Sequence, residues 1–198
     1  MNATANRIEK WPNIVTIGFS KCGTGALAFI DCHPDIVFRL VEPSVFNNKQ
    51  VSLESYNIPK ATLDEVLIEK SPTYVKGGDS ALYKKARLMK QKIPDLKILV
   101  FLCDPIKRLY SHIKMDYEDQ RKRQKYWGKN VTVESVWATA EDHAAQRNVT
   151  ELSTEHNDTL RQKLKFGKFY SKLLPWIKVF GYSQIHLVDG DNLGNDLY

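Results

Sequence analysis

Apolar runs and amphipathic stretches alternate along the chain. Four apolar runs predict strands, and they cover residues 14–17, 35–41, 96–102 and 184–188. The first and third runs are almost continuously apolar and rich in β-branched residues. That pattern is typical of central parallel strands that are covered on both faces. The sequence therefore predicts a sheet with at least two buried strands.

Helical patterns lie between these runs and predict helices over residues 23–32, 79–92, 105–121, 132–147 and 168–180. Pro105 suits the first turn of its helix, with Asp104 as a possible cap before it. This alternation predicts an α/β fold: a P-loop-like, doubly wound parallel sheet flanked by helices, which binds ligands at the carboxyl ends of its strands. The 198 residues suit a single domain, residues 1–198, and we expect no internal repeat.

The turn after the first predicted strand carries the most informative motif, Gly18-Phe-Ser-Lys21-Cys-Gly23-Thr24-Gly25-Ala-Leu. Its amides precede a helix, where unpaired N–H groups and the helix dipole favour an anion. Lys21 adds a positive charge and Thr24 a hydroxyl donor. The predicted anion-binding residues are Lys21, Cys22, Gly23, Thr24, Gly25 and Ala26, with the amides of Cys22, Gly23 and Thr24 unpaired. The alternative is an ordinary tight turn that needs its glycines for backbone geometry alone.

The spacing of this motif differs from that of a nucleotide-hydrolysing P-loop, G-x-x-x-x-G-K-[ST]. In this chain the lysine comes two residues before the second glycine, in the order G-x-x-K-x-G-T. The position of Lys21 therefore argues against a magnesium-dependent nucleotide kinase.

Three further candidate sites lie later in the sequence, after the second predicted strand, in the segment before Pro72, and on the helix after the third predicted strand. Glu42, next to Pro43 and near apolar neighbours, could act as a general base. Lys70, in Glu-Lys-Ser-Pro-x-Tyr, could bring a second cation to the reacting group. Arg108 and Ser111 are three residues apart on a predicted helix and could hold a second phosphate. A solvated loop or helix surface is the alternative for each of them.

The charge and cysteine content adds modest constraints. The net charge of +6 and the pI near 9.1 favour an anionic partner, although the basic runs at 84–92 and 121–125 could be solvated helix faces. The three cysteines, Cys22, Cys32 and Cys103, lack metal-ligand spacing, so we expect no metal.

Targeting signals are mixed. No window approaches the roughly 18 apolar residues of a membrane span, and no secretory leader follows Met1. Four N-x-[ST] sequons, at Asn2, Asn130, Asn148 and Asn157, favour the lumen of the secretory pathway.

The motifs together resemble a known family. G-x-x-K-x-G-T-x-A-L, H-P-D, E-K-[ST]-P-x-Y, D-P-x-x-R-x-x-S and I-H-x-V-D-G-D occur in the order typical of Golgi sulfotransferases that modify heparan sulfate. The pattern is most similar to the glucosaminyl 3-O-sulfotransferases and next to the sulfotransferase domain of the N-deacetylase/N-sulfotransferases. The resemblance runs from about Pro12 to Leu193.

The resemblance implies sulfuryl transfer from 3′-phosphoadenosine 5′-phosphosulfate (PAPS) to a glucosamine hydroxyl in heparan sulfate or a related acidic glycan, without a metal and without a nucleic-acid partner. It implies the Golgi lumen, with membrane attachment only through an anchor that this chain does not contain. Lys21, Gly23 and Thr24 match the loop that binds the 5′-phosphosulfate, and Ser111 matches the serine that holds the 3′-phosphate. Glu42 matches the catalytic glutamate, and Lys70 matches the lysine near the transferred group.

Several positions depart from the family pattern. Cys103 stands where the family has an arginine before Asp-Pro, and Ser44 stands where it has a histidine. Ser20 and Gly25 replace loop arginines, and Asn47 replaces an aspartate. The sequence also ends before the family's C-terminal lid segment. These departures favour, as the alternative, a catalytically impaired glycan- or nucleotide-binding paralogue.

Overall fold

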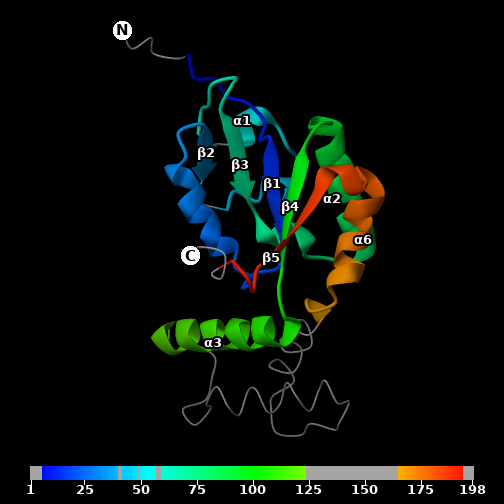
Figure 1. Ribbon diagram of the computed structural model, residues 1–198. Coiled ribbons are helices and arrows are strands. Elements are labelled where there is room, and N and C mark those ends of the chain that lie inside the picture. Colours follow the sequence, from blue (N-terminus) through cyan, green and yellow to red (C-terminus); the bar gives the residue numbers. More distant parts are fainter. Residues whose placement is uncertain (1–5, 40–41, 49, 57–58, 124–164, 194–198) are drawn as a thin grey trace, which may run out of the picture. The chain divides into compact units, whose positions relative to one another are not determined.

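A five-stranded, all-parallel sheet is the centre of the fold (Figure 1). The computed structural model describes residues 6–39, 42–48, 50–56, 59–123 and 165–193. In spatial order the strands are β2 (Ile36–Arg39), β3 (Val66–Lys70), β1 (Ile14–Gly18), β4 (Lys97–Leu102) and β5 (Ile185–Asp189). The doubly wound α/β prediction is therefore confirmed.

The strand that the sequence analysis missed is β3, which lies between β2 and β1 and pairs with both. It is short and ends in two charged residues, Glu69 and Lys70, so its pattern does not stand out as a strand. In the register, Lys70 faces Thr16 of β1, and the amide of Ser71 donates to the Thr16 carbonyl at 2.9 Å. The carboxyl ends of β1 and β3 thus lie side by side.

Helices cover both faces of this sheet. The crossover from β1 to β2 contains η1 (Thr24–Cys32), whereas α2 (Asp79–Lys92) and α6 (Phe169–Phe180) lie on crossovers that run in the opposite direction along the sheet. Right-handed crossovers therefore place η1 on one face and α2 with α6 on the other, where α2 and α6 lie together (Figure 1).

The helix predictions fared unevenly. The bounds of α2 match the prediction for residues 79–92, and α6 continues through Pro175. The helix expected at 23–32 is a 3₁₀ helix that begins at Thr24, not an α-helix. The helix expected at 132–147 lies outside the described residues. Short elements fill the remaining connections: η2 (Val45–Asn47), α1 (Leu53–Tyr56), η3 (Pro72–Val75) and η4 (Tyr182–Gln184).

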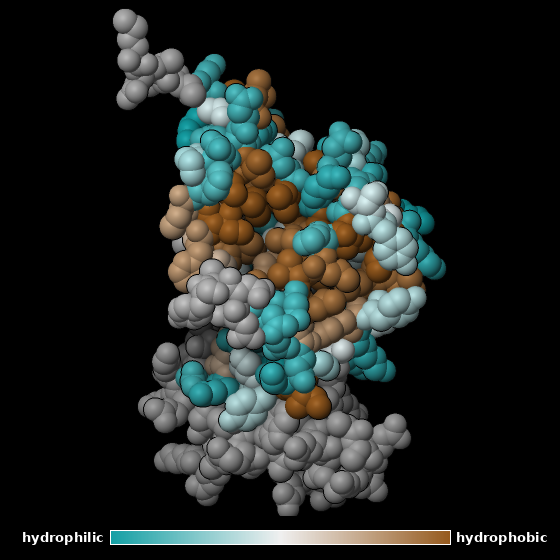
Figure 2. Space-filling model, in the orientation of Figure 1, coloured by the Kyte–Doolittle hydropathy of each residue, from teal (hydrophilic) through white to brown (hydrophobic). Residues whose placement is uncertain are grey.

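The core lies between the central strands and the α2–α6 layer. Side chains of β1 and β4 are fully buried there, together with residues of both helices: Val15, Ile17, Ile98, Val100, Leu82, Met89 and Trp176. Each such side chain contributes roughly 1.5–3 kcal/mol of burial free energy. Figure 2 shows apolar residues gathered over the strands between η1 and α6, with hydrophilic residues around them. This packing makes the strand ends a firm base for the loops.

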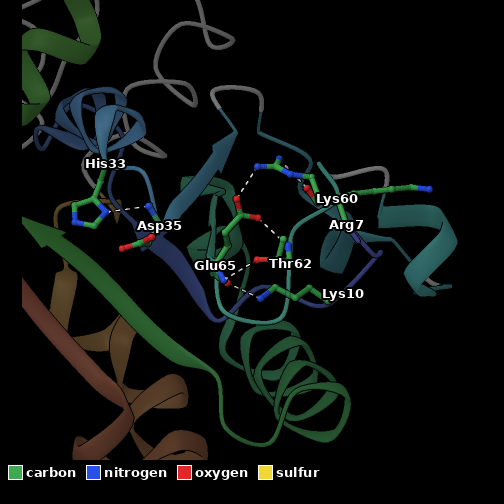
Figure 3. A network of polar contacts seen from close by, with 7 residues as sticks. All are labelled: Arg7, Lys10, His33, Asp35, Lys60, Thr62 and Glu65. Atoms are coloured by element: carbon green, nitrogen blue, oxygen red, sulfur yellow. Dashed lines mark hydrogen bonds and ion pairs between the residues drawn. The ribbon is translucent and has the colours of Figure 1, made fainter. Parts of the chain in front are cut away.

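A polar network holds the loops at the opposite, amino-terminal edge of the sheet (Figure 3). Arg7 makes a 2.6 Å ion pair with Glu65, and Lys10 donates to the Glu65 carbonyl at 2.5 Å. The second carboxylate oxygen of Glu65 accepts from the Thr62 amide at 2.7 Å. This edge is thus closed by contacts within the protein itself.

The chain divides into two compact units, Met1–Leu102 with Phe169–Tyr198, and Cys103–Lys168. The second contains α3 (Pro105–Arg123), whose first turn is capped as expected: the Asp104 carboxylate accepts from the amides of Ile106 at 2.7 Å and Lys107 at 3.0 Å. The single-domain assignment stays a prediction. Within the described ranges, every helix is too short or too polar to span a bilayer.

Candidate active site

The turn after β1 adopts a backbone shape that few residues accept. Gly18, Lys21 and Gly23 all have positive φ, at 135°, 75° and 83°. The amide of Cys22 donates to the Phe19 carbonyl at 3.1 Å, so it is not one of the unpaired amides that the sequence predicts. That expectation is corrected for Cys22 because the turn closes on itself one residue earlier.

The amides that follow remain available. Since η1 is a 3₁₀ helix, its first internal bond runs from the Ala26 amide to the Gly23 carbonyl, at 2.9 Å. In the part of the chain that the structure describes, no acceptor takes the N–H groups of Gly23, Thr24 and Gly25. Thr24 is buried, and Lys21 is exposed. Three adjacent donors and a cation form a site suited to an anion.

Residues after β5 form a wall against this turn, which the sequence analysis did not foresee. The Gly190 amide donates to the Leu102 carbonyl at 2.6 Å. A Cβ atom at Gly23 would lie 2.8 Å from Leu193 Cδ1, and a Cβ atom at Gly190 would overlap the Cys22 carbonyl. The glycine within Val-Asp-Gly-Asp was the available signal, because such a close approach of two backbones excludes a side chain.

The structure brings Glu42 and Lys70 together. The Lys70 Nζ lies 3.3 Å from Glu42 Oε1, and the two side chains are 15% and 40% exposed. Val45 and Phe46 are buried, but the Glu42 carboxylate faces an ammonium and solvent instead of the apolar surroundings that the sequence suggests. The pair lies at the carboxyl end of β3, next to β1, the strand that leads into the turn with open amides.

A second carboxyl group, Glu69, lies buried directly before Lys70. It is 1% exposed, and its Oε1 accepts from Ser71 Oγ at 2.5 Å and from the Tyr74 hydroxyl at 2.7 Å. Burial raises the pKa of Glu69 to about 7, against the opposing effect of these hydrogen bonds. The sequence motif contained this glutamate, but nothing in its type or spacing assigned it a role.

The buried Lys85 amine contacts the backbone carbonyl of Tyr74. Lys85 Nζ, from α2, donates to the Tyr74 carbonyl at 2.9 Å and lies 5.8 Å from the centre of the Tyr74 ring. Burial lowers the pKa of Lys85 to about 8. Burial and the neighbouring Glu69 charge raise the pKa of Tyr74, so its hydroxyl keeps its proton and serves as a donor.

Arg108 and Ser111 lie on α3, in the other compact unit. Arg108 is buried, its Nη1 is 3.3 Å from His112 Nδ1, and burial lowers the pKa of its guanidinium. Ser111 is half-buried on the next turn. Their role in holding a second phosphate stays a prediction. Within the described ranges, no three His, Cys, Asp or Glu side chains gather as metal ligands.

Comparison with known proteins finds similarity to heparan sulfate sulfotransferases over most of this chain. It is 28% identical over 195 residues to heparan sulfate glucosamine 3-O-sulfotransferase 5 of Mus musculus, covering 94% of this chain and 50% of that protein. It is 27% identical over 209 residues to the bifunctional heparan sulfate N-deacetylase/N-sulfotransferase of Drosophila melanogaster, covering 93% of this chain and 18% of that protein. The chain thus spans half or less of the length of these curated relatives. No family model matches it.

A solved structure supports the fold. The crystal structure of a sulfotransferase from Alicyclobacillus acidocaldarius matches with a TM-score of 0.63 and 20% identity, over 94% of this chain and 76% of that chain. The resemblance expected from the motifs, and the sulfotransferase fold, are therefore confirmed.

Proposed function

We propose that this chain, which resembles the heparan sulfate sulfotransferases over nearly its whole length, moves a sulfuryl group from PAPS to a hydroxyl of a glucosamine unit in heparan sulfate or a related glycan. The proposal rests above all on one observation. An ion pair of Glu42 and Lys70, 3.3 Å apart, lies at the carboxyl end of β3, beside the strand that leads into a turn with open amides.

The turn after β1 is the proposed binding site for the phosphosulfate end of the donor. Its open amides, at Gly23, Thr24 and Gly25, would donate to phosphate or sulfate oxygens, and Lys21 would supply a positive charge. The Cys22 and Ala26 amides are already used within the protein, so these two residues would shape the turn and not bind through those N–H groups.

Glu42 is the proposed general base. Its carboxylate would take the proton of the acceptor hydroxyl while that oxygen bonds to sulfur and the bond from sulfur to the 5′-phosphate oxygen breaks. The leaving group is adenosine 3′,5′-bisphosphate, and negative charge grows on its phosphate oxygen. Lys21, Lys70 and the turn amides would stabilise this charge, as fixed donors do in other group transfers. Lys70 also keeps the Glu42 carboxylate in place before the acceptor arrives.

The proposal also covers the 3′-phosphate of the donor, the glycan partner and the cellular compartment. Arg108 and Ser111 would bind the 3′-phosphate of the nucleotide. The partner would be an acidic glycosaminoglycan, which suits the net charge of +6, and the place of action would be the Golgi lumen.

Two measurements on the purified chain test the proposal. Isothermal calorimetry with adenosine 3′,5′-bisphosphate reports nucleotide binding, and transfer of radiolabelled sulfate from PAPS to N-sulfated heparan reports turnover. We expect both binding and transfer. Nucleotide binding without transfer to any glycan would favour the catalytically impaired paralogue, and the absence of nucleotide binding would refute the proposal.

A further inference from the structure

We propose that Glu69 is a positioning residue for the reaction above: its buried carboxyl group fastens the loop that carries Glu42 to the turn that follows Lys70. The inference rests on the proposed function, because it concerns the relative placement of that base and that cation. It starts from the contacts between the segment 42–48 and the segment 69–74.

Two hydrogen-bond relays converge on one oxygen of Glu69. In the first, the Ser44 amide donates to Ser71 Oγ at 3.0 Å, and Ser71 Oγ donates to Glu69 Oε1 at 2.5 Å. In the second, the Phe46 amide donates to the Tyr74 hydroxyl at 3.3 Å, and that hydroxyl donates to the same oxygen at 2.7 Å. Each hydroxyl has only one proton, and it accepts from an amide, so its own proton points to Glu69.

The direction of both relays makes the carboxyl group necessary. Two hydroxyl donors aim at one buried point, and only an acceptor-rich group such as a carboxyl or amide oxygen satisfies both. Without that acceptor, Ser71 and Tyr74 would each retain a buried, unpaired proton or turn away from the amides of the Glu42 loop. The amides lie two and four residues after Glu42, so their release would free the segment that holds the base.

The loop itself has a conformation that needs such support. Ser44 has a left-handed backbone, with φ of 50°, which a residue other than glycine adopts only at a cost of about 1 kcal/mol. A second layer of contacts holds it from outside: Ser44 Oγ and Thr73 Oγ1 are 2.7 Å apart, and Asn47 Nδ2 donates to Thr73 Oγ1 at 3.0 Å. Both layers join the same two segments.

The strand side of the connection is rigid. Glu69 and Lys70 belong to β3, which pairs with a strand on each side, and Lys85 anchors the Tyr74 carbonyl from α2 at 2.9 Å. The relays therefore fasten a less regular loop to a fixed support. Since a displacement of about 1 Å can cost 10²-fold in rate, this connection bears directly on proton removal by Glu42.

A three-variant series tests the proposal. Glu69→Met removes the acceptor and should lower kcat about 10²-fold, with the calorimetric affinity for adenosine 3′,5′-bisphosphate changed less than about threefold. Glu69→Gln keeps an acceptor oxygen of the same size and should regain kcat to within about fivefold of the wild type. Glu65→Gln, which alters a hydrogen-bonded carboxylate just before the same strand, is the matched control and should behave as the wild type.

Unchanged kcat in Glu69→Met would overturn the proposal, and so would equal losses in the Met and Gln variants. If the Met variant fails to fold, Tyr74→Phe is the alternative test. It removes only the hydroxyl that connects the Phe46 amide to Glu69 and leaves the relay through Ser71 intact. We expect it to lower kcat about tenfold at constant nucleotide affinity, with Tyr182→Phe as an exposed control. An unchanged kcat in Tyr74→Phe would equally reject the role.

Amide hydrogen exchange separates this proposal from the proposed function. The Ser44 and Phe46 amides should be protected in the wild type and should exchange faster in Glu69→Met or Tyr74→Phe. A wild-type chain without sulfate transfer would refute the proposed function alone, whereas unprotected amides at both positions would refute the fastening by Glu69.

Discussion

The turns that follow β1 and β3 lie on adjacent strands, yet they use their polar groups in opposite ways. After β1, the amides of Gly23, Thr24 and Gly25 have no acceptor among the described residues. After β3, the hydroxyls of Ser71 and Tyr74 are each bonded on both sides within the protein. Open donors suit a ligand that comes and goes, whereas paired donors suit a permanent support. In the two proposals, the turn after β1 therefore binds the donor and the turn after β3 positions the base.

Lys21→Ala is the strongest test of the first turn. Loss of this charge should lower sulfate transfer about 10³-fold and weaken nucleotide binding, because Lys21 faces the growing negative charge in the proposed site. The free energy of unfolding should change by less than about 0.5 kcal/mol, since the side chain is exposed. Lys97→Ala, at the amino end of β4, is the control for general loss of a lysine. Normal turnover in Lys21→Ala would remove Lys21 from the site.

The buried Glu69, which holds the turn after β3, should make the free energy of unfolding depend on pH. Glu69 has a pKa raised from 4.5 to about 7 in the folded chain, so the folded state binds more protons than the unfolded state between these values. The contribution of Glu69 to the free energy of unfolding should therefore be fully present below pH 4.5 and fall by up to about 3 kcal/mol as pH rises to about 7. Urea unfolding of the wild type and Glu69→Gln measures this.

In Glu69→Gln the fall across that window should be absent. Lys85 does not interfere, because its pKa is lowered from 10.5 to about 8, and its contribution to the free energy of unfolding changes with pH only above about 8. Identical pH profiles for the two proteins would show that Glu69 does not titrate in this range.

Glu42 is the proposed base, and in the proposal it acts on an acceptor beside the donor that the turn after β1 holds. Glu42→Gln should lower kcat about 10²-fold and leave the affinity for adenosine 3′,5′-bisphosphate unchanged, because it removes a general base but no proposed nucleotide contact. Glu9→Gln, an exposed carboxylate before β1, serves as the control. A kcat equal to that of the wild type would assign the base to another group.

The smallest effects should come from two buried hydroxyls, one in each turn. Ser71→Ala breaks a relay and should lower the free energy of unfolding by about 1–2 kcal/mol. Thr24→Val keeps the shape of a side chain that is 7% exposed and should leave stability nearly unchanged, while it weakens nucleotide binding about tenfold. Chemical denaturation and calorimetry on both variants measure the contrast. A reversed pattern would contradict the division into binding and positioning turns.

The sequence predicted most of the sheet but not its most consequential strand. β1 and β4 were predictable because strands buried on both faces are almost continuously apolar, and α2 because its apolar residues recur with helical spacing. β3 was missed because its two last residues, Glu69 and Lys70, are charged, and only tertiary contacts explain a buried carboxyl group there. Local pattern does not encode which distant hydroxyls will satisfy such a group.

The candidate site was predictable to a similar degree. Glycine spacing located the turn after β1, and its anion binding stays a prediction. The bond from the Cys22 amide to Phe19 and the 3₁₀ start that leaves the Gly25 amide open both depend on packing. The motifs named Glu42 and Lys70 separately, and their 3.3 Å pairing required the fold of residues 42–48. The glycine in Val-Asp-Gly-Asp signalled a close backbone approach, but spacing could not show that its partner is the turn after β1, because the two segments lie far apart in the sequence.

The contact between Gly190 and the turn after β1 has a consequence for the order in which the chain folds. The turn at Lys21–Gly23 follows β1, whereas Gly190 follows β5, and the other three described strands lie between them in the sequence. The backbone contact between Cys22 and Gly190 closes a loop of nearly the whole chain, so it forms late and only after loop-closure entropy has been overcome. While the chain folds, the turn after β1 therefore stays incomplete until β5 and Gly190 have packed against it.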